Sequence, residues 1–187
     1  MRSSKPAIRT AMYAAAILVF GVAALRIVQV RADAKSDTPQ MRVAEVQPRA
    51  MEDTTQKAVL RDYVAAWKAI GSAMAENSTM PLADNFTGFA REQLTQRIKD
   101  QRNAGLTTRI VDRGHRIDAI FYSRDGSAVE LRDIAAIETQ VLEGGTVVHS
   151  DTSRIEYLAI LTSAADRWQV RLLQSVPDNE SAATNQH

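Results

Sequence analysis

The sequence of 187 residues contains no cysteine, and this absence removes several classes of site at once. Without a thiol the chain cannot form a disulfide, a zinc site with cysteine ligands, an iron–sulfur cluster or a cysteine nucleophile. A surplus of either charge is also missing, because 23 Lys and Arg face 22 Asp and Glu, for a net charge of +1. Nucleic-acid-binding domains normally carry a basic surplus on one face, so we expect no nucleic-acid partner.

Histidine is scarce, and the common spacings of metal and nucleotide sites are absent. The three histidines are His115, His149 and His187, and they form neither H-x-x-x-H nor H-E-x-x-H. The chain has no G-x-S-x-G, Walker-type or G-x-G-x-x-G segment, and residues 144–145 (GG) indicate only a turn. We therefore expect neither a metal nor a cofactor, and the sequence favours a non-enzymatic role over a catalytic one.

The N-terminal region contains the longest apolar stretch of the chain. Residues 10–25 carry no charge, and beyond Arg26 the apolar stretch continues to residue 30. A membrane-spanning helix needs about 20 mainly apolar residues, and an arginine near its end can place its guanidinium among the lipid headgroups. We therefore expect a transmembrane helix over residues 10–30, preceded by a short basic tail over residues 1–9 that stays in the cytoplasm.

A cleaved signal peptide over residues 1–34 is the alternative. Ala32-Asp33-Ala34 matches the small-residue pattern that precedes a cleavage site. Both interpretations place the following chain outside the cytoplasm. A retained helix predicts a single-pass protein of the inner (cytoplasmic) membrane whose C-terminal domain is periplasmic, with the membrane itself as one partner.

The rest of the chain divides into a linker, one domain and a tail. Residues 31–51 mix charges with two prolines and show no sustained period, which predicts a linker. Residues 52–177 carry periodic apolar patterns and have the length of one domain. Residues 178–187 are polar, and we expect them to form a disordered tail.

Two amphipathic helices are predicted at the start of this domain. The first runs from Glu52 to Asn77, with a cap at Thr54 or Thr55, and its apolar residues recur at three- and four-residue spacing. The second is capped by Thr87 and ends near residue 103. Its expected buried face consists of Phe86, Phe89, Ala90, Leu94 and Ile98.

After the second helix the apolar period changes to two, which predicts four or five antiparallel strands. A three-residue loop over residues 124–126 would pair Ala119 with Leu131 and Phe121 with Val129. This register puts both apolar sets on one face of the sheet. Helices followed by strands indicate an α+β fold, with the helices packed on the concave face of a curved antiparallel sheet.

Two polar residues fall on the apolar face of this predicted sheet. In the preferred register Asp133 lies opposite Ile117 and His115 lies opposite Ala135, so the polar residues are diagonal neighbours within side-chain reach. A carboxyl group in apolar surroundings binds a proton more readily, which makes Asp133 a candidate general base beside His115. The alternative is a structural pair, in which Asp133 satisfies a backbone donor or an arginine and His115 lies at the rim. The residues expected to line a pocket here are Tyr63, Trp67, Phe121, Asp133 and Tyr157.

Two segments resemble those of a known superfamily. Residues 64–69 (VAAWKA) and residues 165–170 (ADRWQV) are similar to segments of the nuclear transport factor 2-like superfamily, whose final strand usually reads D-G-R-W-x-V. Here no glycine separates Asp166 from Arg167, which alters the turn. The resemblance covers roughly residues 52–176. It implies a cone-shaped α+β domain.

Within that superfamily the chain resembles anchored members: the IMS-domain proteins of plastid-division type, the mammalian-cell-entry-associated membrane proteins and the bridging subunit of type IV secretion systems. That resemblance implies a non-catalytic interaction or scaffold module of an envelope complex, which binds protein partners or a second copy of itself. The superfamily also includes SnoaL-like cyclases and ketosteroid isomerases, so the fold does not decide the function. The alternatives are a domain that binds a small apolar ligand in its cone, and a secreted isomerase- or cyclase-like enzyme that uses His115 and Asp133.

Overall fold

The computed structural model describes residues 40–43 and 46–177, and residues 40–176 belong to one compact unit. The expected cytoplasmic tail, the transmembrane helix over residues 10–30 or signal peptide over residues 1–34, much of the linker and the C-terminal tail lie outside the described residues. Within the described ranges, no helix has the length and apolar character needed to cross a membrane.

Two long helices form where the apolar period predicts them. Helix α2 (Asp53–Glu76) has Glu52 at its N-cap, two or three residues before the expected threonine caps, and Asn77 at its C-cap in the left-handed conformation. A short 3-10 helix, η1 (Met80–Leu82), leads to α3 (Gly88–Asn103), which has Thr87 at its N-cap as predicted. The expected buried face of α3 is only partly correct: Phe86 is buried before the helix begins, whereas Phe89 is 53% exposed.

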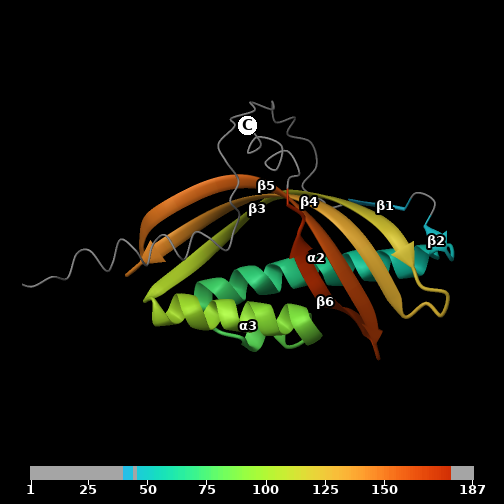
Figure 1. Cartoon of the computed structure of the whole chain (residues 1–187), viewed down its shortest axis with the longest axis horizontal. Helices are drawn as coiled ribbons and strands as arrows, with labels where there is room; N and C mark the ends of the chain where they lie inside the picture. Colours follow the sequence, from blue (N-terminus) through green and yellow to red (C-terminus); the bar gives the residue numbers. More distant parts are fainter. Residues whose placement is uncertain (1–39, 44–45, 178–187) are drawn as a thin grey trace, which may run out of the picture. The chain divides into compact units, whose positions relative to one another are not determined.

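Four long antiparallel strands follow the helices: β3 (Leu106–Tyr122), β4 (Ala128–Glu143), β5 (Thr146–Ala164) and β6 (Arg167–Ser175). Two short strands, β1 (Gln40–Arg42) and β2 (Gln47–Pro48), pair with β3 in parallel, so the sheet is mixed rather than purely antiparallel. Both short strands lie in the segment predicted to be a linker. The order of strands in the sheet is β1-β3-β4-β5-β6, with β2 beside β3 (Figure 1).

The predicted register of β3 and β4 is correct as far as Ala119, which lies opposite Leu131. A bulge between Ala119 and Phe121 then shifts the pairing, so Val129 lies opposite Tyr122 and not opposite Phe121. As a result the Tyr122 side chain is buried and Phe121 is 39% exposed. The prediction that Phe121 lines an interior pocket is therefore wrong. The connecting loop is also longer than expected, because it covers residues 123–127.

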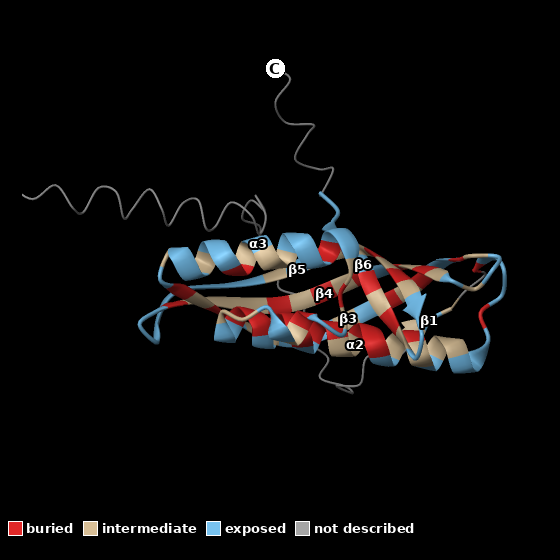
Figure 2. Ribbon diagram, turned by 90° about the horizontal axis from the view of Figure 1, so that it is seen from below, coloured by how far each residue is buried: buried red, intermediate tan, exposed pale blue. Residues whose placement is uncertain are grey.

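The sheet is curved, and both long helices lie against its concave face (Figure 1). Figure 2 shows buried residues on the sides of the helices and strands that face one another. These residues form one hydrophobic cluster, and burial of each large apolar side chain contributes about 1.5–3 kcal/mol. The cluster includes Val59, Tyr63, Trp67, Ile70, Leu82, Phe86, Ile117, Leu131, Tyr157, Leu161, Trp168 and Val170.

Polar contacts hold the helical part of the chain to the last strand. The carboxylate of Asp62, which is only 8% exposed, accepts a 2.8 Å hydrogen bond from the backbone N–H of Trp168. The segment before α3 also pairs with β6, because Val170 donates to the carbonyl of Asn85 and accepts from the N–H of Thr87. Strand β6 therefore bonds to residues of α2, to this segment and to β5.

Candidate functional site

The candidate site is a chain of hydrogen bonds centred on Asp133, in the middle of β4. Oδ2 of Asp133 accepts a 2.9 Å hydrogen bond from the hydroxyl of Tyr63 on α2. The same oxygen lies 2.8 Å from Nδ1 of His115 on β3. Asp133 is 0% exposed and Tyr63 is 1% exposed. The helix and two strands thus bring their polar groups together inside the hydrophobic core.

Alternation along the strands explains why these polar groups face the core. Asp133 lies between Leu131 and Ala135 on the inward side of β4, with Ile117 as its cross-strand partner, and His115 lies opposite Ala135. Both pairs were predicted from the sequence. Tyr63 belongs to the apolar stripe of α2, which packs against the same face of the sheet.

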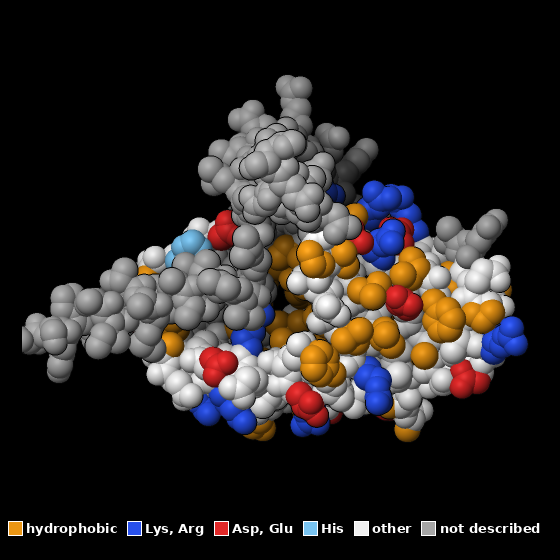
Figure 3. All heavy atoms as spheres, in the orientation of Figure 1, with side chains coloured by type: hydrophobic (Ala, Val, Ile, Leu, Met, Phe, Trp, Pro, Cys, Tyr) orange, Lys and Arg blue, Asp and Glu red, His pale blue; other side chains and the backbone are white. Residues whose placement is uncertain are grey.

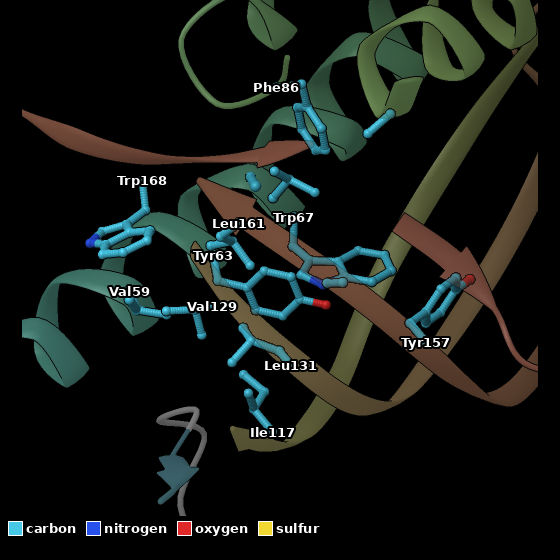
Figure 4. Packing of buried hydrophobic residues seen from close by; sticks show 14 of the residues in the cluster. Val59, Tyr63, Trp67, Phe86, Ile117, Val129, Leu131, Tyr157, Leu161 and Trp168 are labelled. Atoms are coloured by element: carbon cyan, nitrogen blue, oxygen red, sulfur yellow. The ribbon is translucent and has the colours of Figure 1, made fainter. Parts of the chain in front are cut away.

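Aromatic rings enclose the His115–Asp133 pair. The ring of Trp67 lies 4.9 Å from the ring of His115 and 5.3 Å from that of Tyr157, measured between centroids. In Figure 4 the indole nitrogen of Trp67 lies beside the Tyr63 hydroxyl. That nitrogen does not reach hydrogen-bonding geometry with any partner, and Oδ1 of Asp133 also has none. Each remains desolvated without the hydrogen bond that normally offsets its burial.

Burial and the Asp133 carboxylate determine the electrostatics of the site. Burial, followed by the charge of Asp133, raises the pKa of Tyr63 well above its ordinary value of 10. For His115, burial lowers the pKa, but the hydrogen bond to Asp133 and the charges of Asp133 and Asp112 outweigh it, so its pKa lies above the ordinary 6.5. A raised pKa favours the imidazolium form of His115, which pairs with the Asp133 carboxylate.

A second polar group, from α3, approaches the cluster beside Tyr157. Burial lowers the pKa of the Arg97 guanidinium to about 10, against an opposing effect of Tyr157. Burial also raises the pKa of Tyr157 to about 12. The Tyr157 hydroxyl points away from Trp67 in Figure 4. Arg97 therefore acts on Tyr157 rather than directly on the His115–Asp133 pair.

The structure brings together most of the residues predicted for the site. His115, Asp133, Tyr63, Trp67 and Tyr157 form one connected cluster through the contacts given above, and Phe121 does not belong to it. The cluster is closed: the His115 side chain is 3% exposed and the Asp133 side chain 0%. The residues can exchange a proton with one another, but the buried Asp133 carboxylate is not exposed to solvent.

Asp112 is a member that sequence reasoning missed. Its Oδ1 lies 3.4 Å from Nε2 of His115. Residues three apart on a regular strand point to opposite faces, but a bulge between Asp112 and Gly114 puts both side chains on the inward face. An isolated glycine inside a strand pattern is the available signal for such a bulge, and Gly114 provides it.

The described residues offer little else that could hold a cofactor. They contain no group of three or more His, Asp or Glu side chains placed to bind a metal ion. A shallow hollow of about 480 Å³ lies beside β2 and the start of α2, and none of the predicted site residues lines it. No charged side chain lines it either; its residues are Val43, Val46, Gln47, Pro48, Ala50, Met51 and Gln56.

Comparison with known proteins identifies the fold. No family model matches the chain, and no curated protein matches it. Among solved structures, the intermembrane space region of the chloroplast protein ARC6 matches with a TM-score of 0.60 at 13% sequence identity, over 70% of this chain and 100% of that one. This likeness shows that the chain has the fold of that region. The two helices on a curved mixed sheet fit the nuclear transport factor 2-like architecture implied by the sequence resemblance.

Two further matches have lower scores. A protein of unknown function from Mycobacterium tuberculosis, Rv3472, matches with a TM-score of 0.47 at 16% identity, over 73% of this chain and 85% of that one. A protein from Catenulispora acidiphila in complex with S-DNPA matches with a TM-score of 0.47 at 17% identity, over 68% of this chain and 99% of that one.

Proposed function

We propose that the protein is a membrane-anchored extracytoplasmic interaction module, a non-catalytic scaffold of an envelope complex, and that the convex face of its sheet binds the protein partner. The observation that supports this proposal is a group of apolar residues on that face. Ile160 pairs with Leu172, and Leu158 precedes Ile160 by two positions on β5. All three residues are half-buried, and none belongs to the hydrophobic core cluster.

The position of this group follows from the register. Ala159 and Leu173, which are their sequence neighbours, form the adjacent cross-strand pair and face the core. Leu158, Ile160 and Leu172 therefore project from the opposite, convex face, whereas α2 and α3 lie on the concave side (Figure 1). Figure 3 shows hydrophobic side chains gathered over one part of the surface, with charged residues among them. Apolar surface bounded by charged residues is typical of protein–protein interfaces.

A charged pair borders this apolar group. Arg132 lies opposite Leu158 and forms a 3.1 Å ion pair with Glu156. Neighbouring charges of both signs suit a two-fold symmetric contact, in which the same surface must complement itself. A second copy of this chain and another envelope protein are both candidate partners, and the crosslinking experiment below distinguishes them by mass.

Replacing Ile160 with lysine is the direct test of the interface. Ile160 lies opposite Glu130, so the new charge has an acidic cross-strand neighbour and the fold should tolerate it. Formation of the interface would still have to remove water from the new charge, so association should weaken about tenfold or more, which corresponds to about 1.4 kcal/mol. The measurement is crosslinking of the full-length protein in native membranes, read as the yield of discrete higher-mass species.

Met80→Lys is the matched control, because Met80 is 83% exposed and belongs to η1. We expect the control to give the crosslinked species at wild-type yield. An Ile160→Lys variant that crosslinks as well as wild type would exclude this face as the interface. A wild-type protein that gives no crosslinked species at any concentration would count against the interaction module itself.

The fate of the N-terminus tests the membrane anchor separately. We expect the membrane fraction to contain chains that begin at Met1 or Arg2, because a retained helix over residues 10–30 would anchor them. N-terminal sequencing of the protein from membrane and soluble fractions measures this directly. A terminus at Lys35 in the soluble fraction would instead support cleavage and secretion, which is the premise of the enzyme alternative.

The isomerase- or cyclase-like alternative has one observation in its favour, the 2.8 Å contact between His115 and Asp133. It also requires an opening through which a substrate reaches the pair, and the observed exposures of 3% and 0% oppose this. The same closure opposes a small apolar ligand inside the cone. Detection by mass spectrometry of a ligand that co-purifies with the protein would favour the ligand-binding alternative over the scaffold module.

A further inference from the structure

The bulge in β3 contains an unusual turn of the backbone. Pairing with β4 shifts between Asp112 and Gly114, and Gly114 has a φ of 132°, a region that side-chain-bearing residues rarely adopt. Its backbone N–H donates a 2.8 Å hydrogen bond to Oδ1 of Asp112. The side chain of Asp112 therefore closes the bulge, and it remains 54% exposed to solvent.

His115 follows the bulge and lies between two carboxylates. Nδ1 is 2.8 Å from Oδ2 of the fully buried Asp133, and Nε2 is 3.4 Å from Oδ1 of the half-exposed Asp112. The Nε2 contact has ion-pair distance but not hydrogen-bond geometry. The same Asp112 oxygen thus faces both the Gly114 N–H and the imidazole ring.

The proton on His115 decides whether the second contact is attractive. An imidazolium donates from both nitrogens and attracts both carboxylates. A neutral imidazole that keeps its Nδ1–H for Asp133 presents a lone pair at Nε2, which repels the Asp112 carboxylate. The orientation of the Asp112 side chain, and hence its bond to Gly114, then depends on this single proton.

We propose that the bulge over residues 112–114 is a pH-sensitive clamp, in which protonated His115 holds Asp112 against the strand and neutral His115 releases it. The connection runs from solvent at Asp112 through His115 to Asp133 and Tyr63. This inference concerns the folded domain itself and does not depend on the proposed partner or on the membrane anchor.

Side chains from β3, β4 and α2 surround His115. Strand β3 contributes Asp112 and β4 contributes Asp133, the two acids that favour the charged ring. Helix α2 contributes Tyr63, which is bonded to Asp133, and the uncharged Trp67. Beyond Trp67 lie Tyr157 on β5 and Arg97 on α3, which act on each other. No base among these described residues contacts the ring, so the two acids dominate.

The direction of the pH effect follows from linkage. Because the pKa of His115 in the folded state lies above its ordinary value of 6.5, the folded protein binds this proton more tightly than the unfolded chain does. The resulting stabilisation is fully present below about pH 6.5 and is lost as the pH rises through the folded-state pKa. The clamp should open over the same interval.

Two NMR measurements on the full-length protein in detergent micelles test the clamp. Imidazole signals are followed from pH 5 to 9, with His149→Asn and His187→Asn used to assign His115. Amide exchange of Gly114 is followed after selective ¹⁵N-glycine labelling and corrected for base catalysis. We expect His115 to titrate above 6.5, and the protection of Gly114 to fall roughly two- to fivefold through that titration, as suits a half-exposed ion pair.

The variant that separates this clamp from a fixed bulge is Asp112→Asn. Its amide oxygen still accepts from Gly114, but it carries no charge for His115. We expect its His115 titration to move to lower pH and the pH dependence of Gly114 protection to disappear. Asp118→Asn, on the same strand, should leave both measurements unchanged. The clamp is overturned if wild-type Gly114 protection is constant across the His115 titration, or if Asp112→Asn keeps the full pH dependence.

Discussion

Replacing Asp133 with alanine is expected to lower the free energy of unfolding by about 3–5 kcal/mol, one of the two largest effects that we predict for a single substitution. The Asp133 carboxylate accepts a hydrogen bond from the Tyr63 hydroxyl and contacts Nδ1 of His115, and both contacts lie in the hydrophobic core. Its removal leaves a phenol and an imidazole buried without their partner, and each unsatisfied group costs about 1–3 kcal/mol. The cavity left by the carboxylate adds to this loss.

Urea unfolding at pH 6, followed by circular dichroism, measures this change. Asp133→Asn is the informative companion, because its amide can accept from Tyr63 while carrying no charge. We expect it to cost about 1–2 kcal/mol, less than the alanine variant. Asp118→Ala on the convex face serves as the surface control, with a change within about 0.5 kcal/mol. A loss below about 1 kcal/mol for Asp133→Ala would show that the buried chain of hydrogen bonds contributes little to stability.

Replacing Trp67 with alanine is expected to cost about 3–5 kcal/mol as well. The indole contacts the rings of His115 and Tyr157 and is 9% exposed, so its removal leaves a cavity beside the polar cluster. An apolar cavity of this kind can bind a molecule of the missing shape. Added indole should therefore raise the melting temperature of the variant in proportion to ligand binding, and should leave the wild type unchanged.

Thermal unfolding with and without indole measures this rescue. Trp168→Ala is the matched control, since Trp168 is also buried, at 8% exposure, but Figure 4 places it away from Trp67. The imidazole signal of His115 should move in Trp67→Ala and stay in place in Trp168→Ala. Equal stabilisation of wild type by indole would contradict the closed interior, because it would show that a pocket already exists.

The period of the apolar residues predicts much of this fold, because it shows which side of each strand faces the core. Alternation with period two assigns each residue to one face, so the facing pairs Ile117–Asp133 and His115–Ala135 could be predicted from the sequence. The same reasoning failed at Phe121, because a single inserted residue reverses the faces beyond it. Bulges leave the local pattern almost unchanged, and sequence alternation alone does not locate them.

Other features were missed because their causes are not local. Strands β1 and β2 have three and two residues, too short for any period, and β3 stabilises them by pairing. Asp62 reads as a surface residue of an amphipathic helix, but its carboxylate accepts from the backbone of Trp168. That partner is 106 positions away along the chain, a separation that helical periodicity does not detect.

The position of β6 near the end of the domain affects the order in which the protein can fold during synthesis. Both Asp62 on α2 and the carbonyl of Asn85 bond to backbone N–H groups of this strand, at Trp168 and Val170. A ribosome synthesises these two positions about a hundred residues after α2, and such distant contacts form slowly. The bonds that join α2 and the segment before α3 to β6 can therefore form only after nearly all of the domain has been translated.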